Sequence, residues 1–449
     1  MLHTPGPALL TYFEEHGIRD VECIFPDMAG YPRGKLMPAH NFAAGSELRI
    51  AQAIPMQCIT GDYSFDPIFP DSDPDVRLVP DYTTLKISPW SSVPRAIAIH
   101  DCVELDGQPC LFAARSLLKA VVARYVAQGL RPVVAPEIEF YLTAPNPDPS
   151  VPFSAPIARG GRGEVGQSAF SMNMLNELAP FWNALRAALD GLGVQTDTWI
   201  HEVGTTQYEI NLLHGDPVKV ADQAFLFKYT AKETAIQHGL NAVFMAKPIA
   251  GDQGSSMHLH QSVVDAHGRN IFSTDEGTES AAFGHFIGGL QTYMPDMMLL
   301  FAPYVNSYRR YVSNSQAPVN LEWGYDNRTT GLRIPRSAAA ARRVENRIAG
   351  ADANPYLVMA ASLAAGLAGM EDQCDPTVAL PPGTNSNELG HTLARSFLPA
   401  HHQMVNSIAV RRLLGDSFVT GFCAAKSVEY DNYLHEVSAW ERRFLGPQV

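Results

Sequence analysis

The feature that most restricts the fold of this chain is a spacing of two between charged or imidazole side chains inside apolar segments. The segment APEIEFYL carries Glu137 and Glu139, MHLHQS carries His258 and His260, and RRVENR carries Glu345 between two arginines. Side chains two residues apart on a strand point to the same face of a sheet. The sequence therefore predicts a sheet with a face of buried charge, which is costly unless ions of opposite charge neutralise it.

A fourth segment completes the pattern. HEVGTTQYE places Glu202 and Glu209 on either side of a short turn, so the two can lie beside each other on adjacent strands. One such pair is more often a solvated face or a salt bridge than a metal site, so the argument depends on the four segments together. Hard divalent cations take oxygen ligands, and Mg²⁺ is the usual one near phosphates. The four segments therefore predict a divalent-cation site.

Arginines gather in the segments that follow. NSYRRYV, YDNRTTGLRIP and ARRVENR contain Arg310, Arg328, Arg333, Arg343 and Arg347. The planar guanidinium group suits carboxylate and phosphate recognition, and structural ion pairing is the alternative. Carboxylate-bound metals together with several arginines indicate phosphoryl transfer, in which positioning and charge neutralisation carry most of the catalysis.

Length and charge limit the class of protein. A chain of 449 residues is too long for one ordinary core, so two domains are expected. The net charge of −13 argues against a nucleic-acid or anionic-membrane partner. The six cysteines are scattered without a CxxC spacing, which favours a reducing cytoplasm over a disulfide framework. The N-terminus is not that of a signal peptide, and the apolar run 356–370 is short for a membrane span and indicates a buried helix.

The order of the segments predicts two unlike parts. The first contains a helix over 8–16 and a hairpin that bends at Asp27 to Gly30, followed by short β-like runs. Beyond a boundary near residue 111, helices and strands alternate, with a continuous helix expected over 168–193 and a strand over the segment NAVFMAKPI (241–249). The glycine-rich segment RGGRGEVG lacks GxxxxGK[ST], so it is a loop but no P-loop.

Six motifs resemble the glutamine synthetase family in their order along the chain. They are APEIEFYL, HEVGTTQYEIN, KPIAGDQGSSMHLHQS, NSYRRYV…QAPV, NRTTGLRIP and ARRVENRIAGADANPY. The resemblance covers about residues 111–449 and implies an α+β protein. A small β-grasp-like N-terminal domain (1–110) would precede a large glutamine-synthetase-type α/β catalytic domain (111–449).

The resemblance implies a role for each residue. Each site would hold two or more Mg²⁺ or Mn²⁺ ions. One ion, near glutamate, would be bound by Glu139, Glu202 and Glu209. Another, near the ATP phosphates, would be bound by Glu137, His258 and Glu345. The ATP side would consist of His260, Ser262, Arg328, Arg333 and Arg343. The glutamate side would consist of Gln253, Gly254, Arg310 and Arg347, with the two arginines close to the reaction.

The family chemistry would proceed through an acyl phosphate. The γ-carboxylate of glutamate attacks the γ-phosphate of ATP, and an amine then attacks γ-glutamyl phosphate. The resemblance also implies a cytoplasmic homo-oligomer of stacked hexameric rings, a dodecamer, with active sites between subunits. The N-terminal residues of one subunit would then lie over the catalytic domain of the next.

The departures from the family pattern gather on the ammonia side. Gln316 stands where glutamine synthetases have a glutamate that helps to deprotonate ammonium, and Gln253 stands in the place of an asparagine. The aspartate segment that helps to bind ammonium aligns with MQCITGDYSF, where Asp62 is a possible substitute; Asp62 and Asp66 are candidate bases. The pattern resembles the γ-glutamylamine branch, which includes γ-glutamylputrescine and γ-glutamylpolyamine synthetases.

Four functions remain open at this point. The leading hypothesis is a ligase that joins glutamate to an organic primary amine with ATP. The alternatives are an ammonia-using glutamine synthetase, a kinase acting on another carboxylate or a guanidino group, and a non-catalytic scaffold or sensor. Retention of all the expected metal carboxylates speaks against the last of these.

Overall fold

The N-terminal part of the chain forms a six-stranded sheet. The computed structural model describes residues 4–64, 72–312, 316–390 and 392–449. The first helices and strands are α1 (Pro7–Glu15), β1 (Asp20–Pro26), β2 (Pro32–Pro38), α2 (Ala39–Ala43), β3 (Leu48–Ala51), β4 (Asp75–Pro80), β5 (Lys86–Ile87) and β6 (Arg95–Val103). The strand order is β2-β1-β6-β4-β3, with β5 also paired to β6. The pair β1–β6 is parallel, and the other described pairs of this sheet are antiparallel.

The predicted hairpin is confirmed by the pairing of β1 with β2. Asp20 lies opposite Pro38, and Pro26 opposite Pro32. At the bend, Gly30 has a φ of 76°, which glycine adopts without strain, and its amide donates to the carbonyl of Asp27 at 2.9 Å. Whether this sheet is a β-grasp domain ending near residue 111 stays a prediction.

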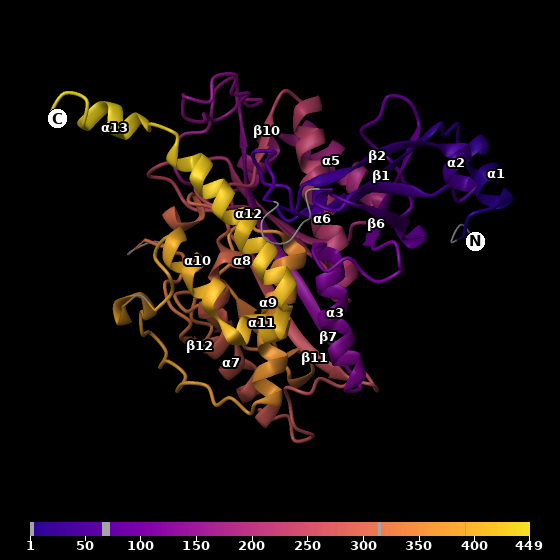
Figure 1. Cartoon of the computed structure of the whole chain (residues 1–449). Coiled ribbons are helices and arrows are strands. Elements are labelled where there is room, and N and C mark those ends of the chain that lie inside the picture. The colour runs from indigo at the N-terminus through magenta and orange to yellow at the C-terminus, as the bar shows by residue number, and fades with distance from the viewer. Residues whose placement is uncertain (1–3, 65–71, 313–315, 391) are drawn as a thin grey trace.

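The remainder of the chain is built on an eight-stranded sheet. Its strands are β7 (Leu130–Thr143), β8 (Thr196–His201), β9 (Gln207–Leu212), β10 (Asn241–Val243), β11 (Met257–Asp265), β12 (Trp323–Tyr325), β13 (Leu332–Ile334) and β14 (Val344–Asn346). Their order is β12-β13-β14-β11-β7-β9-β8, with β10 also paired to β7. The two long strands β7 and β11 run antiparallel through the centre of the molecule (Figure 1).

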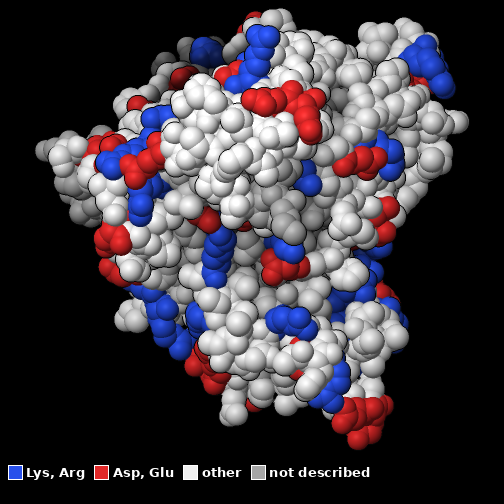
Figure 2. Space-filling model, turned by 90° about the vertical axis from the view of Figure 1, so that its right-hand side faces the viewer, with Lys and Arg blue, Asp and Glu red and all other residues white. Residues whose placement is uncertain are grey.

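Helices cover this sheet and close the core. They are α3 (Ala114–Ala127), α4 (Met172–Glu177), α5 (Ala179–Leu192), α6 (Pro217–Gln237), α7 (Ala281–Tyr293), α8 (Met298–Phe301), α9 (Pro355–Glu371), α10 (Phe397–Asn406), α11 (Ile408–Leu414), α12 (Asp416–Leu434) and α13 (Ala439–Phe444). The C-terminal helix α13 projects from the body, and the N-terminal elements lie at the opposite side (Figure 1). Acidic and basic side chains are interspersed over the face drawn in Figure 2.

The apolar run 356–370 is a buried helix, as predicted. Every residue of α9 from Pro355 to Gly369 is buried. The helix packs closely on α7, because a Cβ placed on Gly289 would lie 2.5 Å from the Cα of Gly369. Among the described residues, none of the helices combines the length and apolar character needed to cross a bilayer.

Two expected elements differ from the observed ones. The helix expected over 168–193 is divided into α4 and α5, which meet at Leu178. Pro180 lies in the first turn of α5, and it has no amide hydrogen with which to continue the preceding helix. The strand expected over the segment NAVFMAKPI is limited to Asn241–Val243.

Buried arginine contacts join the two parts of the chain. Arg115 of α3 is 2% exposed. Its guanidinium group lies 2.7 Å from Asp81 and 2.6 Å from Asp101, both on the N-terminal side, and 2.8 Å from Asp222 of α6. This network fixes the N-terminal sheet against α3 and α6, which pack on β7 of the larger sheet.

Candidate active site

Strand register brings the predicted residues to one face of the larger sheet. Glu139 of β7 lies opposite Glu209 of β9, and Glu137 lies opposite His258 of β11. On the next strand pair, His260 lies opposite Glu345 of β14. Since opposed residues of antiparallel strands present their side chains to the same face, the spacing seen in the sequence becomes a continuous polar surface.

The first cluster consists of Glu139, Glu202 and Glu209. One carboxylate oxygen from each lies within 4.8 Å of the others. Burial, with the charge of Glu202, raises the pKa of Glu139 to about 7, and burial with three neighbouring carboxylates raises the pKa of Glu209 well above its usual value. Three carboxylates so close together suit a hard divalent cation, which takes oxygen ligands and would remove the repulsion between the carboxylates.

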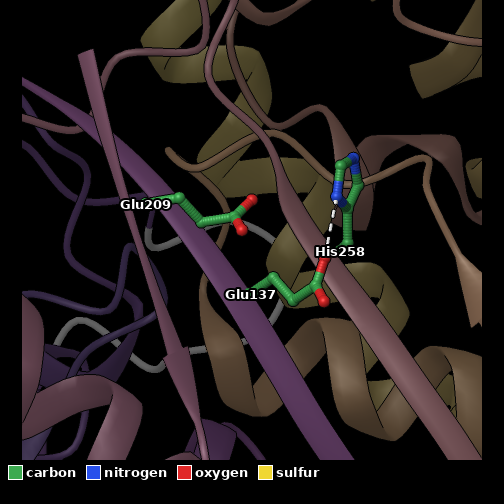
Figure 3. Close-up of side chains that lie close together, drawn as sticks. All are labelled: Glu137, Glu209 and His258. Atoms are coloured by element: carbon green, nitrogen blue, oxygen red, sulfur yellow. Dashed lines mark ion pairs between the residues drawn. The ribbon is translucent and has the colours of Figure 1, made fainter. Parts of the chain in front are cut away.

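The second cluster is centred on Glu137. Its carboxylate can share an ion either with Glu209 and His258 or with His260 and Glu345, since ligand atoms of each set lie within 4.8 Å of one another. Figure 3 shows Glu137 and Glu209 on neighbouring strands and the contact of Glu137 with His258. In this contact, His258 Nδ1 lies 3.5 Å from Glu137 Oε2.

The ionisation of this cluster suits a metal site. Burial opposes ionisation of Glu137, but its hydrogen bonds with the two histidines outweigh burial and hold its pKa well below the usual range. Burial and the charge of Arg347 lower the pKa of His258 to about 4. At neutral pH the pair is therefore a carboxylate and a neutral imidazole, which are the forms that bind metals.

Hydrogen bonds separate the roles of the two histidines. Arg343 Nε donates to His260 Nδ1 at 3.1 Å, so that nitrogen carries no proton. The other nitrogen, Nε2, then donates to Oε1 of Glu137 at 2.9 Å. The geometry therefore favours His258 over His260 as the ligand, and it turns His260 toward Arg343.

Arg343 and His260 lie at a cavity of about 570 Å³. Ser262, Glu137 and Asn211 of β9 also line it. Three of the five residues expected on the ATP side, namely His260, Ser262 and Arg343, are thus brought together beside the second cluster, whereas Arg333 does not line this cavity. Arg328 lies outside this lining, and its charge acts on Glu202 instead.

Arginines surround Glu345. Arg333 and Arg347 each donate to one of its oxygens at 2.6 Å. Burial raises the pKa of this carboxyl, but Arg347, the histidines and Arg333 bring it to about 2. The Nε groups of both arginines are buried without a hydrogen-bond partner among the described residues. Each arginine therefore has a donor that a small movement of its side chain would make available to an anion such as a phosphate.

The loop before β11 packs against Arg310. A Cβ on Gly254 would meet Arg310 Cγ at 2.8 Å and the carbonyl of Ala246 at 2.9 Å, so glycine is required for this approach. Arg310 is 4% exposed and donates to the carbonyls of Ile348 at 2.7 Å and Arg347 at 3.1 Å. The carbonyl of Gln253 accepts from Tyr141 at 2.9 Å.

Of the residues expected to act on the amine, Asp62 makes its described contacts away from the acidic clusters. The Asp62 carboxylate accepts from Thr60 at 2.8 Å and from Asn432 of α12 at 2.6 Å. Gln316 is exposed and follows residues 313–315, which lie outside the described ranges, as does Asp66. Within one chain, the described contacts of Asp62 thus point to α12 and not to the acidic clusters.

Sequence reasoning missed the residues that orient Glu139. Ser256 donates to its carboxylate through the amide at 2.9 Å and through the hydroxyl at 2.6 Å, and Gln207 donates at 3.1 Å. A signal was available, because Ser256 precedes His258 by two residues and Gln207 precedes Glu209 by two.

Comparison with known proteins agrees with this geometry. Residues 112–445 match the family described as "Glutamine synthetase, catalytic domain". The chain belongs to the glutamine synthetase family. A glutamate–isopropylamine ligase of Pseudomonas sp. is 32% identical over 96% of this chain and 95% of the relative, and a glutamine synthetase of Pyrococcus abyssi is 33% identical over 93% and 92%.

Other relatives extend the comparison. The γ-glutamylputrescine synthetase PuuA of Escherichia coli K12 is 34% identical over 80% of this chain and 76% of its own length. A solved structure titled "GmaS/ADP complex" superposes with a TM-score of 0.82 at 28% identity, covering 97% of this chain and 98% of the other. The resemblance to the family and to its amine-ligase branch is confirmed, and the chain is a ligase of this family with an α+β fold of glutamine-synthetase type.

Proposed function

We propose that the protein joins the γ-carboxylate of glutamate to an organic primary amine, with ATP, through γ-glutamyl phosphate. The observation that carries the proposal is the register that aligns Glu139 with Glu209 and Glu137 with His258 on one face of the sheet. Two adjacent acidic clusters beside buried arginines provide the charge pattern that phosphoryl transfer to a carboxylate requires.

The residues divide between the two substrates. Glu139, Glu202 and Glu209 would hold one Mg²⁺ or Mn²⁺ ion. A second would lie at Glu137, His258 and Glu345, which combine members of the two sets that Glu137 can join. Bound divalent ions would offset the negative charge that gathers on the γ-phosphate oxygens. His260, Ser262 and Arg343 would face the nucleotide, and Arg328 and Arg333 the phosphates. Gln253, Gly254, Arg310 and Arg347 would position glutamate.

The choice of an organic amine rests on Gln316. A glutamine side chain accepts a hydrogen bond but cannot neutralise ammonium or take up its proton. An organic amine has a tail that contributes binding energy, so it depends less on carboxylates at the reacting nitrogen. The amine ligases among the relatives, one named for isopropylamine and one for putrescine, support this choice.

The position of Asp62 supports a site that is shared between subunits. In a ring-shaped homo-oligomer, the loop around Asp62 would face the acidic clusters of the neighbouring subunit. We therefore propose stacked hexameric rings as the active form. Light scattering should give a mass many times the 49.0 kDa of one chain, and a fully active monomer would refute the assembly.

A panel of acceptors tests the proposed reaction. Phosphate release with glutamate and ATP is measured with ammonia, putrescine, ethanolamine and isopropylamine, each with and without glutamate. An organic amine should give the highest kcat/KM. Without any amine, glutamate and ATP should release phosphate only at a slow background rate. Equal release without glutamate would mean that the protein is a different kinase.

An ammonia-using glutamine synthetase is the second candidate. The observation in its favour is that a glutamine synthetase of Pyrococcus abyssi is as similar to this chain as the isopropylamine ligase is, at 33% and 32% identity. This candidate predicts the highest kcat/KM with ammonia in the same panel.

A further inference from the structure

A second cavity lies beside the turn that carries Glu202. Its volume is about 510 Å³, and Thr206 and Tyr208 form part of its wall. Along β9, Gln207 and Glu209 contribute to the acidic cluster, so the residues that alternate with them face the other way. The cavity therefore lies on the opposite side of β9 from the cluster, and the two are joined at the β8–β9 turn.

The glycine-rich loop supplies the outer wall of this cavity. Gly166 accepts a hydrogen bond from the Thr205 hydroxyl at 3.0 Å, and the Thr205 amide donates to Asp252 at 3.0 Å. Asp252 immediately precedes Gln253 of the proposed glutamate loop. A ligand in the cavity would thus contact a loop that is tied both to the turn and to the glutamate-binding segment.

A buried carboxylate marks the site. Glu164 lines the cavity, and its side chain is 7% exposed. Its Oε2 lies 3.1 Å from His201 Nε2 and accepts from the Thr206 amide at 3.2 Å. Its Oε1 is buried with no hydrogen-bond partner among the described residues. A buried carboxylate oxygen without a donor is unfavourable, so this group is ready to accept one from a ligand.

The rest of the lining indicates the type of donor. A second carboxylate, Glu177, lines the cavity and accepts from the Gly160 amide at 2.7 Å. Apolar side chains of Val165, Met174 and Leu178 complete the wall. Two carboxylates in an apolar cavity suit a cation with a hydrocarbon body. The only other charged side chain among the described lining residues is Arg162, which is exposed.

His201 connects this cavity to the acidic cluster. Its Nδ1 donates to the carbonyl of Glu202 at 2.8 Å and its ring is fully buried, so the 3.1 Å contact between its Nε2 and Glu164 Oε2 requires a proton between the two groups. A change at Glu164 can therefore reach the backbone of Glu202 through one imidazole ring. This contact gives a ligand in the cavity a route to influence the reaction.

We propose that this cavity binds an alkylammonium group. The proposal deepens the proposed amine-ligase function and rests on it for the source of the ligand. That source is either the distal nitrogen of a diamine substrate, reaching past the turn, or a second amine molecule. In both cases Glu164 and Glu177 bind the cation, and the apolar wall packs on its methylene groups.

Binding of putrescine and of n-butylamine, which lacks the second nitrogen, tests the site. Calorimetry uses the full-length protein without ATP. Putrescine should bind at least about tenfold more tightly than n-butylamine. Glu164→Gln should weaken the binding of putrescine by about 10- to 100-fold. Glu177→Gln serves as a second variant in case the first does not fold. Arg162→Gln should leave putrescine affinity equal or higher, and Asp275→Asn, at an exposed position, is the neutral control.

Steady-state kinetics then separates the two sources. If the distal nitrogen of the substrate occupies the cavity, Glu164→Gln raises KM for putrescine and not for n-butylamine. If a second molecule binds, KM is unchanged, and the variant loses the activation or inhibition seen at high putrescine. Unchanged putrescine affinity in folded Glu164→Gln and Glu177→Gln would overturn the site. If ammonia alone supports turnover while the variants still lose putrescine affinity, the amine-ligase function is wrong but the binding site stands.

Discussion

Glu139 of β7 and Glu209 of β9 lie directly opposite each other on antiparallel strands, and both are buried. Opposed like charges destabilise a sheet, and burial adds to the penalty. In the metal-free protein this raises the pKa of both carboxyls, and a bound divalent cation would favour their ionised forms. This relationship ties the proposed chemistry to the stability of the protein.

Metal binding should accordingly raise thermal stability. We expect excess Mg²⁺ or Mn²⁺ to increase Tm by several degrees, because a ligand at about 100 times its Kd contributes about 2.7 kcal/mol. Glu139→Gln should lose most of this increase and all but a trace of turnover. Without metal, the variant should be close to the wild type in stability, because burial already raises the pKa of Glu139 to about 7 and much of the wild-type carboxyl is neutral near that pH. Differential scanning fluorimetry with and without chelator measures both effects.

The exposed Glu279 provides the matched control for this experiment. Glu279→Gln should keep the full metal-dependent gain. If Glu139→Gln keeps it as well, the first acidic cluster does not hold the ion.

Arg333 should act on phosphoryl transfer. Its guanidinium group donates to the buried Glu345 at 2.6 Å, and its Nε is buried without a hydrogen-bond partner among the described residues. Arg333→Ala should slow formation of γ-glutamyl phosphate by about 100-fold or more, and Arg333→Lys, which keeps the charge without the planar fork, should slow it less. Rapid-quench single turnovers with glutamate and ATP give the rate directly.

Arg336 is the control for Arg333. It lies three residues further along the chain, is exposed, and pairs with Asp326 at 3.4 Å. Arg336→Ala should leave the rate unchanged. Equal rates in the two alanine variants would return Arg333 to a structural role.

The sequence predicted the strands that carry the acidic clusters better than the groups that orient their side chains. Spacing of two placed Glu137, Glu139 and His258 on one face because strand geometry fixes that alternation locally. The orientation of Glu139 by Gln207 depends on pairing between segments far apart in the chain, so no local pattern indicates it strongly. The same holds for Asp62, whose partner Asn432 is 370 residues away.

Protonation states were also beyond the reach of the sequence. The H-x-H segment left several uses for its histidines open. The two histidines differ for two reasons. Arg343 Nε donates a hydrogen bond to His260, and burial lowers the pKa of His258. Similarly, the alkylammonium cavity was invisible, because Glu164 is one acidic residue in a loop until folding buries it.

A buried histidine in the N-terminal sheet should make stability depend on pH. Burial lowers the pKa of His100 to about 4 in the folded protein, against about 6.5 in an unfolded chain. Between these values the unfolded chain binds the proton and the folded protein does not, so stability falls as pH falls from about 6.5 toward 4. Between pH 7.5 and 5.5 the contribution of His100 is a loss of about 1.4 kcal/mol.

Urea unfolding at these two pH values measures this loss. In His100→Gln, the free energy of unfolding should no longer show this loss between the two pH values, whatever the change in its absolute value. The exposed His267 is the control, and His267→Gln should behave as the wild type. An identical pH dependence in wild type and His100→Gln would show that His100 is not the group responsible.

The amine preference gives the last prediction, through a substitution at Gln316. Gln316→Glu would place a carboxylate where an ammonia-using enzyme needs one, able to neutralise ammonium and to accept its proton. We expect the ratio of kcat/KM for ammonia to that for the best organic amine to rise by about tenfold or more, since a charge-assisted hydrogen bond contributes about 1.5–3 kcal/mol. Gln316→Asn, which changes length without adding charge, should not raise it. Because the substitution acts on the acceptor, the rate of γ-glutamyl phosphate formation should be the same in all three proteins. A wild type that already prefers ammonia would show that Gln316 does not select the acceptor and that the protein is a glutamine synthetase.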